Sequence, residues 1–291
     1  MVRKKDSLLM RGVKKLGMER IAWSLRRLHC PVPSSALVLE VGSGGNPYPR
    51  ANVLLDAYED TIERYHAPLV KDRPMVFGVV ERMPFQDKAF DFVIASHVLE
   101  HSLDPASFLT ELMRVSKAGY IETPDALCEQ LIPFRFHRLE VTDDDRKIRI
   151  WKKPSWRPRD ELVDLFEKKV KDRHFIRLMK NHPEPFYMRY YWEDSILFEI
   201  VNPEVDISWP MPKYSEVPVG GRSKVRSAVV NAARSLFSQK RRNKEIDIFP
   251  LLKCVECDSI DLVKEQHELS CRQCGVRYPL RSGIPVMMPS A

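Results

Sequence analysis

The sequence predicts an α/β fold that is followed by a small β-rich, metal-binding module. Short apolar runs, typical of buried strands, recur at 36–41, 53–56, 75–80, 90–95 and 119–122. A cluster of glycines comes directly after the first run, and an aspartate closes the second. Near the end of the chain, four cysteines form two Cys-x-x-Cys pairs. The strands and glycines predict the α/β part, and the paired cysteines predict the separate module.

Length and composition set the broad class. A chain of 291 residues suits two domains, or one domain with appendages. A hydrophobic content of 44% with 30% charged residues is ordinary for a soluble protein with a core. No run approaches the roughly 20 apolar residues of a membrane helix, and the apolar run at 7–10 is too short for a signal-peptide core. We therefore expect a cytoplasmic protein without a transmembrane segment.

The net charge of +7 is concentrated in one segment. Residues 222–244 contain eight Lys and Arg and no acid, so the rest of the chain is close to neutral. An apolar stripe in the same segment predicts a basic amphipathic helix: Val225, Val229, Ala232 and Leu236. Such a helix can lie on RNA or an anionic membrane, or it can pack internally as a linker. Both alternatives remain open.

The N-terminal segment, residues 1–35, is expected to form a helix over 7–30. Ser7 is a suitable N-cap, and apolar residues recur at helical spacing. Gly12 and Gly17 weaken this helix, and Pro31 ends it before the first strand.

The glycine cluster predicts a nucleotide-type cofactor site. The motif has the form acid-x-Gly-x-Gly-Gly, and its acid and glycines are Glu40, Gly42, Gly44 and Gly45. Bare backbone lets a ligand approach closely, and an acid at the tip of the next strand, Asp56, can bind ribose hydroxyls. A dinucleotide fingerprint fails because its third glycine is replaced by Pro47, and no Gly-Lys-Ser/Thr phosphate loop follows. A plain glycine turn remains the alternative, and the prolines leave no room for a full helix between Gly45 and Val53.

The second half of this region continues the α/β pattern. Strands are expected over 75–80, 90–95 and 119–122. Between the last two, Asp104 and Pro105 are typical of a helix start, and Phe108, Leu112 and Val115 share one helical face.

These residues carry a family resemblance. The acid-and-glycine motif resembles the first motif of class I S-adenosylmethionine-dependent methyltransferases, and Pro84-Phe85, Phe90-Asp91-Phe-Val and Ser96–His101 resemble the type-11 methyltransferase family over 36–124. The resemblance implies a Rossmann-like sheet with helices on both faces and S-adenosylmethionine as cofactor. The cofactor-binding residues that it implies are Glu40, Gly42, Ser43, Gly44, Gly45, Asp56, Val80, Glu81 and Ser96. One position departs from the family, because Val79 stands where an acid often pairs with the adenine amine.

Candidate catalytic residues follow the fourth strand. Methyl transfer is a direct displacement in which the protein mainly aligns two reactants, and an oxygen acceptor benefits from a base such as histidine. His97 and His101 lie where the resemblance expects the acceptor, and His137 heads the cap predicted within 125–210. His97 is the first candidate. The chain lacks the Asn/Asp-Pro-Pro-aromatic motif of many nitrogen methyltransferases at this point. This favours an oxygen or carbon acceptor.

Residues 125–210 are rich in aromatics and prolines, which favours an α+β cap over the active site that holds the acceptor. Residues 141–148 are expected to form a hairpin whose turn contains aspartates, and a short helix is expected after an Asp160 cap. The alternative is that the aromatic side chains are only a satellite core.

The C-terminal cysteines predict a structural zinc site. The ligands are expected to be Cys254, Cys257, Cys271 and Cys274, with thirteen residues between the pairs. Four thiolates favour tetrahedral Zn²⁺ and leave no open position for substrate, while an iron site or unused thiols are the alternatives. Residues 248–289 also resemble small zinc-ribbon proteins, whose eukaryotic and archaeal members activate methyltransferases by binding them. The resemblance implies a ribbon at 248–291 that acts in cis after a linker at 211–247.

The sequence therefore favours an S-adenosylmethionine-dependent methyltransferase that modifies a hydroxyl of a small molecule or glycan. One alternative is a tRNA, rRNA or protein methyltransferase that uses the ribbon and residues 222–244 for binding. A second alternative is a non-catalytic cofactor-binding scaffold. The oligomeric state stays open.

Overall fold

The computed structural model describes residues 6–64, 66–210, 232 and 236–290. The chain divides into two compact units, each of which is described by itself. The sheet unit comprises Val32–Ala95, Asp104–Gly119 and Glu216–Ala291. The N-terminal unit comprises Met1–Pro31, Ser96–Leu103 and Tyr120–Ser215.

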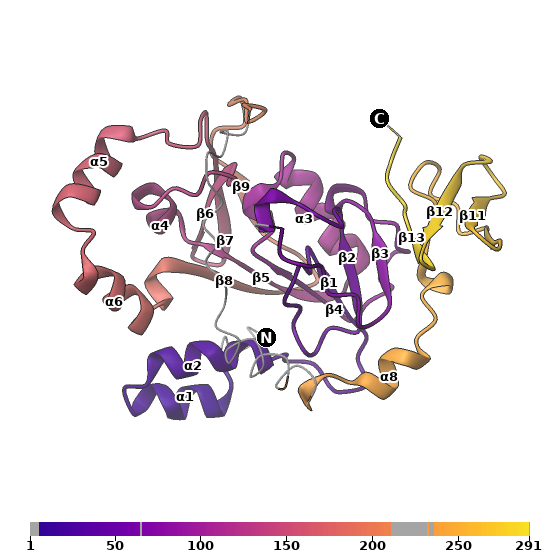
Figure 1. The fold of residues 1–291 in the computed structure, drawn as a ribbon, viewed down its shortest axis with the longest axis horizontal. Coiled ribbons are helices and arrows are strands. Elements are labelled where there is room, and N and C mark those ends of the chain that lie inside the picture. The colour runs from indigo at the N-terminus through magenta and orange to yellow at the C-terminus, as the bar shows by residue number, and fades with distance from the viewer. Residues whose placement is uncertain (1–5, 65, 211–231, 233–235, 291) are drawn as a thin grey trace. The chain divides into compact units, whose positions relative to one another are not determined.

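The sheet unit is built on parallel strands in the order β3-β2-β1-β4 (Figure 1). Their bounds are Val38–Val41 for β1, Val53–Asp56 for β2, Met75–Phe77 for β3 and Phe92–Ser96 for β4. Leu39 of β1 pairs with Val53 of β2 and with Val93 of β4. The side chains of β1 and β2 are buried along the whole strands, as expected for a parallel sheet that is covered on both faces. The predicted α/β class is confirmed.

The connections explain where this sheet continues. Helix α3 (Pro105–Val115) begins as predicted, with Pro105 in its first turn and the Asp104 carboxylate accepting a hydrogen bond from Ser107 N at 3.0 Å. After it, Ser116 forms a parallel bridge with Phe90, just before β5 (Ala118–Pro124) begins. Between β1 and β4, the described residues form 3-10 turns at Ile62–Arg64 and Val80–Arg82 rather than α-helices. The predicted lack of a helix between Gly45 and Val53 is confirmed.

The C-terminal residues form a second, antiparallel sheet in the order β10-β11-β12-β13. Its bounds are Leu262–Lys264, Glu268–Cys271, Arg277–Arg281 and Ile284–Pro285. The chain then returns to the parallel sheet, where Val286 bridges Phe77 of β3 and Met287 N donates to the Phe77 carbonyl at 2.8 Å. Figure 1 shows this yellow segment beside β3, so the ribbon covers an edge strand that would otherwise present unpaired backbone groups.

Most of the predicted basic helix lies outside the described residues, because 211–231 and 233–235 are not among them. The described end of the segment forms α8 (Lys240–Glu245). Asn243 accepts a hydrogen bond from Asn52 at 2.8 Å, and Arg242 donates to the carbonyl of Ala36 at 2.8 Å. This end of the basic segment therefore packs within the sheet unit.

The N-terminal unit begins with two helices where one was predicted. Helix α1 spans Leu8–Lys15 and α2 spans Glu19–Leu25, and a 3-10 turn follows at Arg26–Leu28. The single helix over 7–30 is wrong because Gly17, with φ +72°, takes a left-handed conformation that ends α1. The predicted Ser7 cap is confirmed, since its hydroxyl accepts from Met10 N at 3.2 Å.

The rest of this unit has mixed α and β structure. Its remaining elements are the end of β5, α4 (Ala126–Leu131), β6 (Leu139–Asp144), β7 (Lys147–Lys152), α5 (Asp160–Lys169), α6 (Arg173–Asn181), β8 (Tyr187–Glu193) and β9 (Phe198–Ile200). Strands β6, β7 and β9 form a small sheet. The predicted hairpin is confirmed, and its turn residues Asp145 and Arg146 both have positive φ, as in a primed turn. Asp160 is the first residue of α5 rather than its cap, which is Arg159.

Four predicted strands differ at their ends, and the first of them begins at Val38 rather than at residue 36. The strand predicted over 75–80 stops at Phe77, because Val80 begins a 3-10 turn, while β4 extends to Ser96 and β5 to Pro124. The division of the chain into the five segments 1–35, 36–124, 125–210, 211–247 and 248–291 remains a prediction. None of the helices in the described ranges is long and apolar enough to cross a membrane.

Candidate active site and cysteine cluster

The glycine loop after β1 depends on backbone conformations that favour glycine. Gly42 and Gly44 have φ values of +60° and +55°. Gly45 is required by a close approach, because a Cβ there would lie 2.9 Å from the carbonyl oxygen of Pro68. Glu40 stabilises the loop from within, since its buried carboxylate accepts from Tyr48 N at 2.7 Å. The loop is therefore packed against the chain that follows β2.

Asp56, at the end of β2, joins that segment to the glycine loop. Its carboxylate accepts hydrogen bonds from Gly44 N at 2.9 Å, from Tyr58 N at 3.1 Å and from Arg64 Nη1 at 3.1 Å. The Arg64 side chain also lies over the loop, with Cδ 3.3 Å from the position of a Cβ on Gly44. Ribose hydroxyls that bind Asp56 would compete with Arg64 for the same oxygens.

The side chain of Ser43 can serve a ligand in this loop. The Ser43 hydroxyl is buried, and within the part of the chain that the structure describes it has no hydrogen-bond partner. This orphaned hydroxyl, the left-handed glycines and a strand-end carboxylate fit the methionine and ribose portions of S-adenosylmethionine. Val80 and Glu81 lie in the 3-10 turn after β3, and Ser96 is the last residue of β4. Their roles toward the cofactor stay predictions.

His97 lies in a cluster of carboxylates. It has φ +59°, a conformation that costs a non-glycine residue about 1–2 kcal/mol, and its N–H donates to the Glu122 carbonyl at 2.7 Å. The imidazole, 40% exposed, has Nε2 3.2 Å from Glu122 Oε1 and Nδ1 3.3 Å from Glu100 Oε1. Burial would lower the pKa of His97, but the neighbouring carboxylates Glu100 and Glu122 outweigh it and raise the pKa to about 9. His97 is therefore protonated at neutral pH.

Glu122 is the centre of this cluster, and the sequence-based candidates did not include it. Its side chain is wholly buried and binds Arg26 through Nε at 2.7 Å and Nη2 at 2.9 Å. It also accepts from the Tyr120 hydroxyl and lies 3.4 Å from Ser96 Oγ. Although burial acts to raise it, the pKa of Glu122 is held well below its ordinary value by Arg26 and His97. The sequence feature that could have identified Glu122 is a carboxylate inside an apolar strand. Its partner Arg26 could not be identified in this way, because it comes from a turn far away in the sequence.

His101 and His137 are brought together, and both are deeper than His97. Their rings meet edge to face with centroids 4.8 Å apart. His137 Nδ1 lies 2.7 Å from Glu129 Oε2. Burial and the nearby His137 lower the pKa of His101 to about 4.

The four predicted zinc ligands meet at one point of the ribbon. All four sulfurs lie within 4.8 Å of one another, with Cys254 Sγ to Cys274 Sγ and Cys257 Sγ to Cys271 Sγ both at 3.6 Å. Zn–S bonds of about 2.3 Å in a tetrahedron imply S–S separations of about 3.8 Å. The cluster is consistent with bound zinc, and its four thiolates fit a structural ion.

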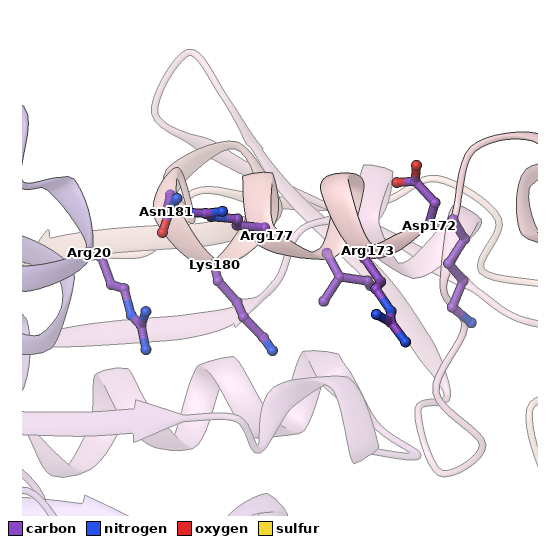
Figure 2. Close-up of a pocket in the computed structure, with 8 residues that line it drawn as sticks. Arg20, Asp172, Arg173, Arg177, Lys180 and Asn181 are labelled. Carbon is purple, nitrogen blue, oxygen red and sulfur yellow. The ribbon is translucent and has the colours of Figure 1, made fainter.

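A basic cavity lies between α2 and α6 in the N-terminal unit. Its volume is about 810 Å³, and Figure 2 shows the side chains that line it. They are Arg20, Lys171, Asp172, Arg173, Ile176, Arg177, Lys180 and Asn181. The Asp172 carboxylate caps α6 by accepting from Phe175 N at 2.8 Å, and Lys171 pairs with Glu167 at 2.8 Å. The remaining cations give the cavity a positive character.

The fold and the glycine loop define a class of enzyme. Residues 39–121 match the family model described as a methyltransferase domain. Residues 39–121 are thus similar to a methyltransferase domain, in agreement with the prediction from the sequence. A search of curated proteins finds no match to the chain.

The solved structures that the chain matches include methyltransferases. A possible histamine N-methyltransferase from Thermotoga maritima is 20% identical, with 40% of this chain and 60% of that chain covered and a TM-score of 0.29. A complex of the Haloferax volcanii Trm112 methyltransferase activator with a methyltransferase is 18% identical, with 50% and 81% covered and a TM-score of 0.31. A sarcosine dimethylglycine methyltransferase-like protein from Galdieria sulphuraria is 12% identical, with 68% and 92% covered and a TM-score of 0.31. The chain spans about three fifths of the first of these structures.

Proposed function

We propose that this protein transfers the methyl group of S-adenosylmethionine to a hydroxyl of a small molecule or glycan. The observation that carries the proposal is the glycine loop with its orphaned Ser43 hydroxyl, inside a region that matches a methyltransferase domain. Gly42, Ser43 and Gly44 would hold the methionine end, and Asp56 would take the ribose hydroxyls after exchanging Arg64 for them. The bound cofactor supplies an electrophilic methyl, and the protein aligns the acceptor with it.

The acceptor class rests on the residues after β4. His97 stands where many nitrogen methyltransferases have an Asn/Asp-Pro-Pro-aromatic motif, and it contacts two carboxylates, Glu100 and Glu122. A histidine that these carboxylates hold in place can accept the proton of a hydroxyl once the imidazole is neutral. Transfer of tritiated methyl into cell fractions divided into RNA, protein, lipid and glycan tests this choice. Label in small molecules or glycans is expected, and label confined to RNA or protein would contradict it.

Cofactor binding is expected to fail when Gly45 gains a side chain. In Gly45→Ala, the new Cβ would meet the Pro68 carbonyl at 2.9 Å, so the loop backbone must shift. We expect S-adenosylmethionine to bind at least about tenfold more weakly by calorimetry, a loss of about 1.4 kcal/mol. Gly12→Ala is the matched control, because a Cβ there meets nothing within 4 Å. Equal affinities of the two variants, or no binding by the unaltered protein, would contradict the proposed cofactor site.

The methylation rate is expected to rise with pH if His97 is the base. Only the neutral imidazole accepts a proton, and the pKa of His97 is about 9, so the rate should climb until pH reaches about 9. In His97→Gln this rise should disappear, whereas His174→Gln on the surface of α6 should keep it. A rate that levels off near pH 7 would show that His97 is not the base.

The same titration gives a stability readout that is independent of activity. The pKa of His97 is raised in the folded state. The contribution of His97 to the free energy of unfolding is therefore complete below its ordinary pKa of about 6.5 and is lost as pH rises through about 9. Thermal unfolding of the unaltered protein should show this loss between those pH values, and His97→Gln should not.

A second candidate function is methylation of RNA, which the basic cavity favours. Arg20 on α2 and Arg173, Arg177 and Lys180 on α6 could bind successive phosphates (Figure 2). Replacing the three α6 cations with Gln distinguishes the candidates. Salt-sensitive RNA binding that these changes abolish would favour RNA, and unchanged binding would remove the candidate.

A further inference from the structure

We propose that Glu100, His101 and His137 form a binding site for one divalent transition-metal ion, separate from the cysteine cluster. Their ligand atoms all lie within 4.8 Å of one another, in the N-terminal unit. Small side-chain rotations would place these atoms about 2.0–2.2 Å from a common ion, the usual distance for nitrogen and carboxylate ligands of zinc. The inference goes beyond methyl transfer and does not depend on it. An ion on Glu100 would offset the negative charge beside His97, so the pH measurements proposed above apply to the protein without this ion.

Glu100 is the first argument for an ion. Its side chain is only 2% exposed, and neither carboxylate oxygen has a hydrogen-bond partner among the residues described. Its ion-pair contact is with His97, whose Nδ1 lies 3.3 Å from Oε1. Both oxygens of Glu100 therefore keep lone pairs that a divalent cation can bind. The Glu100 carbonyl accepts from Arg138 N at 2.7 Å, which fixes the neighbouring segment beside it.

His137 is the second argument, because its orientation is that of a metal ligand. Its Nδ1 lies 2.7 Å from Glu129, which also accepts from Lys153 Nζ at 2.7 Å and from Phe134 N at 2.8 Å. An ionised carboxylate only accepts, so Nδ1 carries a hydrogen, and in the neutral imidazole, which is the metal-binding form, Nε2 keeps its lone pair. A histidine that donates one ring N–H to a carboxylate and binds a metal through the other nitrogen is the common arrangement in metalloproteins. The buried Lys153 holds Glu129 in place for this role.

The ligand set decides the class of ion. His101 follows Glu100 in the 3-10 turn Leu99–His101, and its ring stands at 85° to that of His137. Two imidazoles and one carboxylate suit zinc and related transition metals, whereas Mg²⁺ and Ca²⁺ prefer oxygen ligands. Three protein ligands also leave a coordination position open for an oxygen ligand, unlike the closed cysteine site.

Titration of the full, tag-free chain with Co²⁺ after metal removal tests the proposal. Cobalt replaces zinc in both kinds of site, and only thiolate ligands give an intense charge-transfer band. We expect two equivalents to bind, one with this band and one with weak ligand-field absorption alone. Binding of a single equivalent with the thiolate band would overturn the proposal, because it would assign the metal to the ribbon only.

Single-residue variants show which side chains bind the second equivalent of Co²⁺. Glu100→Gln and His101→Gln should each weaken it at least about tenfold and leave the thiolate band intact. Cys274→Ser should weaken and shift the thiolate band, because three thiolates remain, and should keep the second equivalent, whereas His174→Gln should retain both unchanged. Circular dichroism checks that each variant folds, and one folded variant of Glu100 or His101 is sufficient. Retention of the second equivalent in that variant would also overturn the proposal.

Discussion

Truncation of the chain after residue 247 should leave a protein that does not remain soluble. The removed residues pair with the edge of β3, where Met287 N donates to Phe77 and Val286 bridges the same residue. Ile284, Val286 and Met288 also pack against a buried cluster: Ala51, Leu54, Met75 and Phe77. Each apolar side chain that becomes exposed costs up to about 1.5–3 kcal/mol, against a total stability of about 5–15 kcal/mol. The exposed edge strand adds a risk of aggregation.

A second set of contacts would also be lost in the truncated chain and would increase its loss of stability. Gln86 N donates to the Leu251 carbonyl at 2.8 Å, and Lys253 N donates to the Pro84 carbonyl at 3.1 Å. Arg82 donates to the carbonyls of Val255 and Glu256 beside the first cysteine pair. The segment Pro84-Phe85, which resembles the methyltransferase family, is therefore held in place by contacts with the start of the ribbon.

Metal removal is the milder form of this experiment. Cys274→Ser, or a chelator added to the unaltered protein, should lower the midpoint of thermal unfolding of the whole sheet unit, because the cysteine turns position the strands that reach β3. Cys128→Ser, in the N-terminal unit, should leave the midpoint sensitive to chelator. A truncated chain that stays soluble and melts at the original temperature would show that the ribbon is only an appendage.

The sequence was most informative where local chemistry decides the structure. The Asp104 cap, the parallel strands and the convergence of the four cysteines follow from patterns within short segments. The break at Gly17 was harder to predict, because the apolar spacing continues through it and only its positive φ ends the helix.

Contacts between residues that are far apart in the chain could not be predicted from the sequence. Gly45 was interpreted as making room for a ligand, yet the group that approaches it is the Pro68 carbonyl. Asp56 was expected to be available, but Arg64 already binds it. Glu122 gained its partner from Arg26, 96 positions away, and no local pattern links the two.

Replacing Arg26 should be the most damaging single change in the N-terminal unit. In Arg26→Met the Glu122 carboxylate stays wholly buried and loses two hydrogen bonds, at 2.7 and 2.9 Å. Breaking one partner of a buried ion pair costs about 3–5 kcal/mol, since the remaining charge is uncompensated. His97 would then be the main cation beside Glu122, and the two would be coupled more strongly. Urea unfolding measures the loss.

The double variant Arg26→Met with Glu122→Gln separates charge from packing. Removing the carboxylate as well takes away the uncompensated charge, so the double variant should be more stable than Arg26→Met alone, and the two losses should not add. The neutral amide that replaces the Glu122 carboxylate can still accept from the Tyr120 hydroxyl. If the two losses added instead, Arg26 would stabilise the unit through its packing over the Trp23 ring, 4.0 Å from the ring centroid, rather than through Glu122. The cycle therefore decides whether the cluster around His97 is held by charge or by apolar contact.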